Sequence, residues 1–140
     1  MQILIEIIGT QRVDNQHDKI ELTTTGILTE SESEYIVEYD EQQEQSDPVN
    51  VKVVISKDEG LVEMTRSGAY DSRLIIESSN RNLCHYGSEY GDILMGISGH
   101  SISADFDGEN GEFEFRYDID INGVIASRNS LLMKVKKNQE

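Results

Sequence analysis

The sequence has very few of the residues on which disulfide bonds, nucleic-acid binding or membrane insertion depend. Its only cysteine is Cys84, which excludes an intrachain disulfide and is typical of a reducing compartment. Its 12 basic side chains stand against 27 acidic ones, and the formal net charge of −15 argues against nucleic acid and anionic membranes, which bind through Lys and Arg. No apolar run approaches the ~20 residues of a membrane-spanning helix. We expect a cytoplasmic protein that binds neither nucleic acid nor a membrane.

Signals for secretion and for helices are also missing. No basic residue precedes Arg12, and Glu6 interrupts the first apolar run, whereas a secretory signal has a basic start and a longer apolar segment. No window has apolar residues at sustained helical spacing. With one proline, the turns depend mainly on the 11 glycines. The first residues therefore predict a β-strand.

The pattern that is present is the alternation of β-strands. From Phe113 to Ile121 every odd position is apolar or aromatic, and every even position is charged. Successive side chains of a strand point to opposite faces, so this segment has one face in a core and one in water. The Asn122-Gly123 dipeptide that follows tolerates the positive φ angles of a tight hairpin turn. The same pattern recurs along the chain and predicts an antiparallel all-β domain.

Turn signals divide the chain into about ten strands of a single domain, residues 1–140. The expected strands are 2–9, 18–29, 34–40, 49–57, 61–67, 72–77, 82–87, 91–98, 101–107, 112–121 and 127–137. Gly26 predicts a bulge or a sharp bend, Ser98-Gly99-His100 a connection, and the acidic Asp40–Asp47 segment a solvated loop. Strands with such short connections avoid open edges as a closed antiparallel barrel or as a sandwich, and the pattern favours the barrel.

Arg66 is the most suggestive residue for ligand binding. Val62, Met64 and Arg66 occupy alternate positions of one expected strand, so their side chains point to the same face. This pattern directs Arg66 into the barrel. A buried charge requires a partner. That partner is either the carboxylate or phosphate of a ligand, or an internal glutamate or tyrosine hydroxyl. A bulge near Ser67-Gly68 would instead turn the side chain outward. The sequence leaves these alternatives open.

Three tyrosines complete the set of candidate ligand-binding residues. Tyr86 and Tyr90 lie in a turn-rich stretch, and Tyr117 lies on the apolar side of its strand. At a barrel mouth a tyrosine offers an apolar ring and a polar tip to a small molecule, and it serves equally to fill a core without a ligand. We therefore take Arg66, Tyr86, Tyr90 and Tyr117 as the candidate ligand-binding residues.

Metal-binding and catalytic motifs are weak or missing. The acidic stretch Asp105–Glu112 departs from the helix-loop-helix calcium motif at its glycine and its final glutamate, and it predicts a turn. Cys84 and His85 are adjacent, so on a strand they face opposite sides and cannot form a nucleophile–base pair. His17 and His100 lie far from them in the sequence. We expect no metal, no cofactor and no enzymatic activity.

Short motifs spread over the chain are similar to those of a known family. They are Thr24-Thr25-Gly26, Tyr35, Tyr39-x-Glu41, Arg66-Ser67-Gly68, Tyr86-x-x-x-Tyr90-Gly91, Gly111, Tyr117 and Asn129. In this order the set resembles the YwiB-like family of bacterial proteins of unknown function. The resemblance implies a calycin, or lipocalin-like, β-barrel, and it supplies no reaction, ligand or catalytic residue. The Arg-x-Tyr carboxylate clamp of fatty-acid-binding proteins is missing, because Arg116 and Tyr117 are adjacent.

Two functions of different classes follow from these observations. The first is a non-enzymatic binder of a small, partly apolar or anionic molecule inside the barrel, with Arg66 and the tyrosines as polar contacts. It requires an open, lined cavity, and a barrel filled by its own side chains with Arg66 ion-paired internally would argue against it. The alternative is a protein-interaction or structural module that uses its acidic surface or a sheet edge. An enzyme ranks third, because no titratable groups converge in the sequence.

Overall fold

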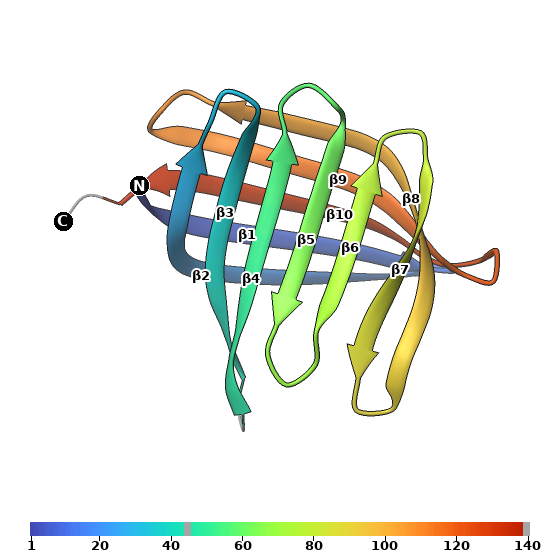
Figure 1. Cartoon of the computed structure of the whole chain (residues 1–140). Coiled ribbons are helices and arrows are strands. Elements are labelled where there is room, and N and C mark those ends of the chain that lie inside the picture. Colours follow the sequence, from blue (N-terminus) through green and yellow to red (C-terminus); the bar gives the residue numbers. More distant parts are fainter. Residues whose placement is uncertain (44–45, 139–140) are drawn as a thin grey trace.

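The alternating segments form antiparallel strands, as their side-chain pattern predicts. The computed structural model describes residues 1–43 and 46–138 (for residues 42, 43 and 46, the backbone only). Its ten strands are β1 (Gln2–Val13), β2 (Gln16–Glu30), β3 (Glu34–Gln43), β4 (Ser46–Ser56), β5 (Leu61–Ser67), β6 (Ser72–Glu77), β7 (Arg81–Ser88), β8 (Gly91–Phe106), β9 (Asn110–Ile121) and β10 (Val124–Lys137). Each strand pairs with its neighbours in the sequence, and β10 pairs with β1, which closes a barrel (Figure 1). The described part of the chain contains no helix with the length and the apolar composition that crossing a membrane requires.

Strand pairing turns the apolar side of each segment inward. On β1, Ile5 and Ile7 are buried, whereas Glu6 between them is exposed. Where β1 meets β10, Ile5 pairs with Val135 and Glu6 pairs with Lys134, so an apolar inner pair alternates with an outer pair of opposite charges. A shift of one residue would exchange the two faces, so this alternation specifies the register in which the barrel closes.

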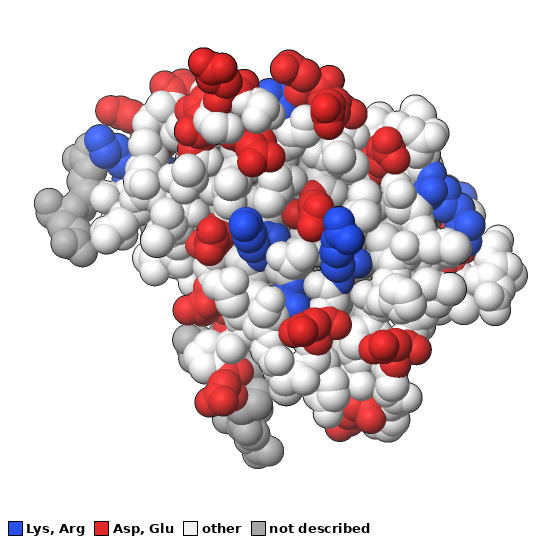
Figure 2. All heavy atoms as spheres, viewed as in Figure 1, with Lys and Arg blue, Asp and Glu red and all other residues white. Residues whose placement is uncertain are grey.

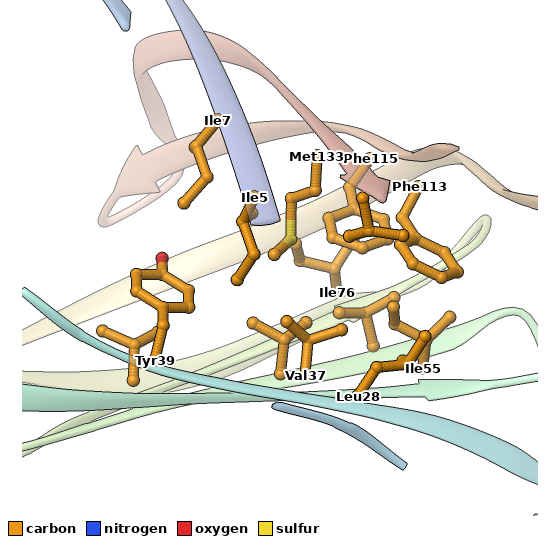
Figure 3. Packing of buried hydrophobic residues seen from close by; sticks show 14 of the residues in the cluster. Ile5, Ile7, Leu28, Val37, Tyr39, Ile55, Ile76, Phe113, Phe115 and Met133 are labelled. Carbon is orange, nitrogen blue, oxygen red and sulfur yellow. The ribbon is translucent and has the colours of Figure 1, made fainter. Parts of the chain in front are cut away.

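A contiguous apolar cluster, which we call the packed core, fills part of the barrel interior (Figure 3). Phe113 and Phe115 are fully buried in it, and the ring of Tyr35 lies 5.2 Å from that of Phe113 between centroids. The other buried apolar members are Ile3, Ile5, Ile7, Leu28, Val37, Tyr39, Val51, Val53, Ile55, Val62, Ile76, Cys84, Ile97, Met133 and Val135. Tyr39 is 7% exposed and lies at one side of the cluster, away from Phe113. It therefore marks a border of the dry interior.

Strand β2 bends sharply, so that it joins both walls of the barrel (Figure 1). At the bend, Gly26 pairs with Ile3 of β1 on one side and with Tyr39 of β3 on the other. A Cβ atom on Gly26 would overlap the carbonyl oxygen of Glu38, so the close approach of β3 requires glycine here. The pairing with β1 continues through Gly26 without a shift, so the strand bends and does not bulge.

Strand β8 corrects one expectation from the sequence. Ser98-Gly99-His100, predicted as a connection between two strands, lies inside this single strand of 16 residues. Its pairing with β9 shifts between Gly99 and Ser101, which is the register change of a β-bulge. A bulge increases the local twist and bends the strand, so one long strand replaces the two predicted ones.

The hairpin ends also differ from the sequence expectation. Strands β1 and β2 extend to a tight turn in which Asp14 has a φ of 53°. The Asp40–Asp47 segment, predicted as a loop, is strand up to Gln43 and again from Ser46, whereas Glu44 lies outside the described residues. The solvent-facing side of a strand accepts charged residues as readily as a loop does, so the acidic composition did not distinguish the two.

The barrel wall has two seams with few backbone pairs. Among the described residues, β2 pairs with β3 only from Gly26 to Glu30, so residues 16–25 of β2 pair with β1 alone. The described pairing between β6 and β7 is the single position where Ser72 faces Tyr86. The lower parts of β3 to β7 project beyond β1 and β2 in Figure 1. On this side of the barrel the inward-facing Tyr86 of β7 and Ile93 of β8 are exposed to solvent.

An ion pair on the outer surface joins three neighbouring strands. Arg81 of β7 donates to both carboxylate oxygens of Asp120 of β9, at 2.8 and 2.7 Å. The two side chains lie over Gly96 of β8, where a Cβ atom would overlap both of them. Asp120 also accepts the Gly123 amide of the β9–β10 turn at 3.0 Å. The hydrogen bonds from Arg81 hold the pKa of Asp120 below its usual range, so this pair is a structural clamp.

Candidate functional site

The accessible side of the barrel carries one continuous row of inward-facing residues. The strand registers place them side by side, one on each strand from β2 to β8: Gly26, Tyr39, Val51, Arg66, Ser72, Tyr86 and Ile93. Neighbouring members are one strand spacing apart, about 4.8 Å. The small Ser72 separates the two larger side chains, Arg66 and Tyr86. The row therefore places these two side chains on one inner face, two strands apart.

Arg66 points inward and has an internal partner. It pairs with Val51 and Ser72, and the register runs on through Ser67 without a bulge. Its Nη2 donates to Oε2 of Glu41, and both side chains remain partly exposed. Of the partners that the sequence left open, the structure supplies the internal glutamate. The guanidinium carries five N–H donors, so donors remain besides the one that Glu41 accepts.

Tyr39, at the border of the packed core, lies close to this ion pair. Its pKa is raised to about 12, first by burial and then by the negative charge of Glu41, while Arg66 acts in the opposite direction. The Tyr39 hydroxyl is therefore protonated at neutral pH. It adds a neutral polar group to the inner face at this border.

The other candidate tyrosines lie apart from Arg66. Tyr90 is almost fully exposed in the turn between β7 and β8, where its amide donates to the Ser88 hydroxyl at 3.2 Å. Tyr117 lies on β9, four strands from Arg66 around the barrel, and burial raises the pKa of its hydroxyl. Tyr86 is therefore the tyrosine of the predicted set that shares a row with Arg66.

Four apolar side chains on the inner face are exposed to solvent. They are Ile20 (72% exposed), Leu22 (38%), Tyr86 (39%) and Ile93 (41%). Leu22 pairs with the buried Ile7 of β1, but in the described pairing no strand lies on the other side of β2 at this point. We call these four residues, with Arg66 and Glu41, the open end. Apolar walls with a few polar groups are typical of small-molecule sites.

The motifs weighed for catalysis and metal binding have structural roles. Cys84 is buried and its Sγ accepts the Ile75 amide at 3.3 Å, whereas His85 is exposed on the other face of β7. The Asp107 carboxylate accepts the amides of Asn110 and Glu109, at 2.7 and 2.9 Å, which lowers its pKa. Among the described residues, no three His, Cys, Asp or Glu side chains are arranged to hold a metal ion.

A hollow on the outer face of the barrel was not predicted from the sequence. It measures about 510 Å³, and we call it the outer hollow. Its lining residues are Thr10, Arg12, His17, His100, Arg116, Asp118, Arg128, Asn129 and Ser130. Parity correctly predicts that Arg116 faces outward. Arg12 and Arg128 meet because β10 closes onto β1. The meeting of these two arginines could be predicted only from the strand register between β1 and β10.

These features define a class: a small, closed barrel of ten antiparallel strands with a packed core and one accessible end. Residues 5–133 match a domain of unknown function, DUF1934, and the chain belongs to this family. It is 27% identical over 108 residues to the uncharacterised β-barrel protein YwiB of Bacillus subtilis (strain 168), covering 77% of this chain and 74% of that protein. The crystal structure of YwiB from Bacillus subtilis has a TM-score of 0.85 at 21% identity, covering 99% of this chain and 92% of that one. The predicted barrel and the YwiB-like resemblance are confirmed.

Proposed function

We propose that this protein is a non-enzymatic binder of a small, partly apolar molecule, which lies at the open end. Two observations argue against the centre of the barrel as the site. Side chains of the packed core, including Phe113 and Phe115, occupy the interior, and Arg66 already has Glu41 as its partner. The proposal depends on one observation, the exposure of the inward-facing Tyr86 and Ile93 on the same row as Arg66. A ligand that covered them would remove apolar surface from water.

The ion pair indicates the polar part of the ligand. Because Glu41 already neutralises Arg66, a free anion gains less here than it would at an unpaired guanidinium. A neutral group that accepts from the guanidinium and donates to the carboxylate, such as an amide, suits the pair better. The apolar part would lie against Tyr86 and Ile93, which face each other across β7 and β8. The lipocalin-like resemblance supports a ligand of this kind only by analogy of fold.

Native mass spectrometry of the protein purified from its own host tests this proposal. We expect an extra mass that disappears on denaturation. In Arg66→Ala the occupancy should fall about tenfold or more, because charge-assisted hydrogen bonds are lost. Arg73→Ala is the matched control: Arg73 also pairs with a glutamate, Glu63, but on the outer face of β6.

The possible outcomes distinguish whether the protein carries a ligand from whether Arg66 contributes to binding it. A bare mass for the wild-type protein in both states would contradict the proposal. An unchanged extra mass in Arg66→Ala would remove Arg66 from the site. A loss of the extra mass in both arginine variants would indicate a general effect of charge and would count against the open end as well.

A second candidate function, a protein-interaction module, is favoured by the free edge of β2. Within the described residues, positions 16–25 of β2 pair with β1 alone, so the backbone groups of the other edge are free to receive a partner's strand. Lys19 and Glu21 form a 2.8 Å ion pair on this segment, and charges on an edge oppose unspecific strand pairing. A bare native mass together with a stable dimer in light scattering would favour this function over ligand binding.

A further inference from the structure

Three arginines gather on the outer face near the turn between β1 and β2, at the right-hand end of β1 in Figure 1. The register places Arg12 of β1 directly opposite Arg128 of β10, and His17 of β2 opposite Arg12 on its other side. In the register of β9 and β10, the residue directly opposite Arg128 is Asp118, and Arg116 lies diagonally to Arg128. On one face of a sheet, directly opposite Cβ atoms are about 5 Å apart and diagonal ones about 7–8 Å.

The contact between Arg12 and Arg128 is unfavourable in the free protein. Like charges directly opposite each other destabilise a sheet. Among the described residues, neither guanidinium has a carboxylate within ion-pair distance, whereas Arg116 pairs with Glu114 at 3.2 Å. Arg12 donates instead to the Asp14 carbonyl at 3.4 Å. The carboxylate that lines the outer hollow, Asp118, lies 2.9 Å from His100. The positive charge of the two guanidiniums is thus left without a partner.

This local excess of basic residues contrasts with the rest of the surface. The chain has a net charge of −15, and Figure 2 shows acidic side chains along the upper edge and scattered with Lys and Arg over the front face. A surface selected for solubility alone accounts for scattered charges. It does not account for three arginines and two histidines that line one hollow. The volume of about 510 Å³ lies in the range of small-molecule sites, about 300–1,000 Å³.

We propose that the outer hollow binds a small molecule that carries two or more linked phosphate groups. Guanidinium groups match phosphate oxygens in a two-pronged geometry, and their charge is not lost at any physiological pH. A single phosphate bridges Arg12 and Arg128, whereas Arg116, displaced diagonally and paired with Glu114 at 3.2 Å, has further N–H donors that a second, linked phosphate accepts. A long nucleic acid is disfavoured, because its other phosphates would lie against the acidic surface. This inference is independent of the ligand proposed for the open end.

Isothermal titration calorimetry at low ionic strength tests the inference, with inorganic pyrophosphate as the probe. We expect the wild-type protein to bind pyrophosphate more tightly than inorganic phosphate. Arg128→Gln should weaken the binding about tenfold or more, since it removes a charge-assisted contact. Lys134→Gln is the matched control, because it removes a positive charge from the same outer face of β10 but outside the outer hollow. It should change the affinity less than about twofold. A titration with ADP, which contains the same diphosphate, shows whether a nucleoside increases the affinity.

The stability of the variant separates lost binding from lost folding. Arg128→Gln removes one partner of a like-charged pair, so without ligand its melting temperature should equal or exceed that of the wild-type protein. A wild-type protein that does not bind pyrophosphate would overturn the inference, and so would equal weakening in Arg128→Gln and Lys134→Gln. Tighter binding of citrate than of pyrophosphate would overturn the phosphate assignment. Arg66→Ala should bind pyrophosphate normally, so a failure at either site leaves the other proposal intact.

Discussion

The packed core and the open end are made from the same alternating strands, yet their inner faces differ in exposure. Ile7 of β1 is buried, whereas Leu22, its direct neighbour on β2, is partly exposed. Ile7 has a paired strand on both sides, and Leu22 has one only on the side of β1 within the described pairing. Alternation therefore decides which face a side chain occupies, and the next strand along the wall decides how deeply it is buried.

The largest expected effect comes from truncating the packed core. Phe113→Ala should lower the free energy of unfolding by about 3–5 kcal/mol, because it removes a fully buried ring and leaves a cavity. Ile20→Ala at the open end should change it by less than about 0.5 kcal/mol, because Ile20 is largely exposed. Urea denaturation measures both. Similar losses at the two positions would show that the open end is covered in solution.

A smaller effect is expected at Gly26, where β2 leaves its partner β3. Gly26→Ala should cost about 2–3 kcal/mol, because the added Cβ would overlap the Glu38 carbonyl and lie 2.8 Å from Ile5 Cδ1. Gly9→Ala is the matched control on β1, since its Cβ would meet only Leu131 Cδ1, at 3.9 Å. Thermal and urea unfolding compare the two variants. If Gly26→Ala is as stable as Gly9→Ala, the bend does not depend on glycine.

The smallest effect is a pH dependence at the border marked by Tyr39. The pKa of Tyr39 is about 12 in the folded protein, against an ordinary value of about 10. Because folding raises the pKa of Tyr39, its contribution to the free energy of unfolding is fully present below pH 10. This contribution is lost as the pH rises towards 12. From this residue the free energy of unfolding should fall by about 1 kcal/mol between pH 9 and pH 11. Tyr39→Phe should flatten that decline in urea titrations, and an unchanged slope would show that Tyr39 ionises freely.

Most of the fold could be predicted from the sequence, because alternation is a local property. The segment from Phe113 to Ile121 predicted β9, and the Asn122-Gly123 turn separates it from β10. The errors occurred where local chemistry is ambiguous. Gly99 in β8 has the composition of a turn, but at this bulge glycine allows the close approach of the Glu77 carbonyl, which a Cβ atom would overlap. The acidic residues after Tyr39 look like those of a loop, but Asp40 lies on the outer face of β3 and Glu41 pairs with the inward-facing Arg66.

Less of the candidate site could be predicted, because it depends on contacts between distant strands. Parity correctly turned Arg66 inward, but its partner Glu41 lies two strands away on β3, and the intervening register of β4 determines their meeting. Tyr90 shares parity with Tyr86 but lies beyond the end of β7, in a turn. Arg12 and Arg128 are separated by almost the whole chain. A sequence shows the chemistry of each side chain, whereas the meeting of residues that are far apart in the sequence depends on how the barrel closes.

The closure of β1 onto β10 has a consequence for how the protein is made. Of the ten strands of the barrel, β1 emerges from the ribosome before the others, and one of its two partners, β10, is synthesised only when the chain reaches Lys137. Until then the apolar residues Ile3, Ile5 and Ile7 stand beside an unpaired edge. Contacts this distant in sequence slow folding, and an uncovered apolar strand is prone to aggregate. The first strand of the barrel is thus among the last to be completed, and it stays vulnerable until β10 has been synthesised.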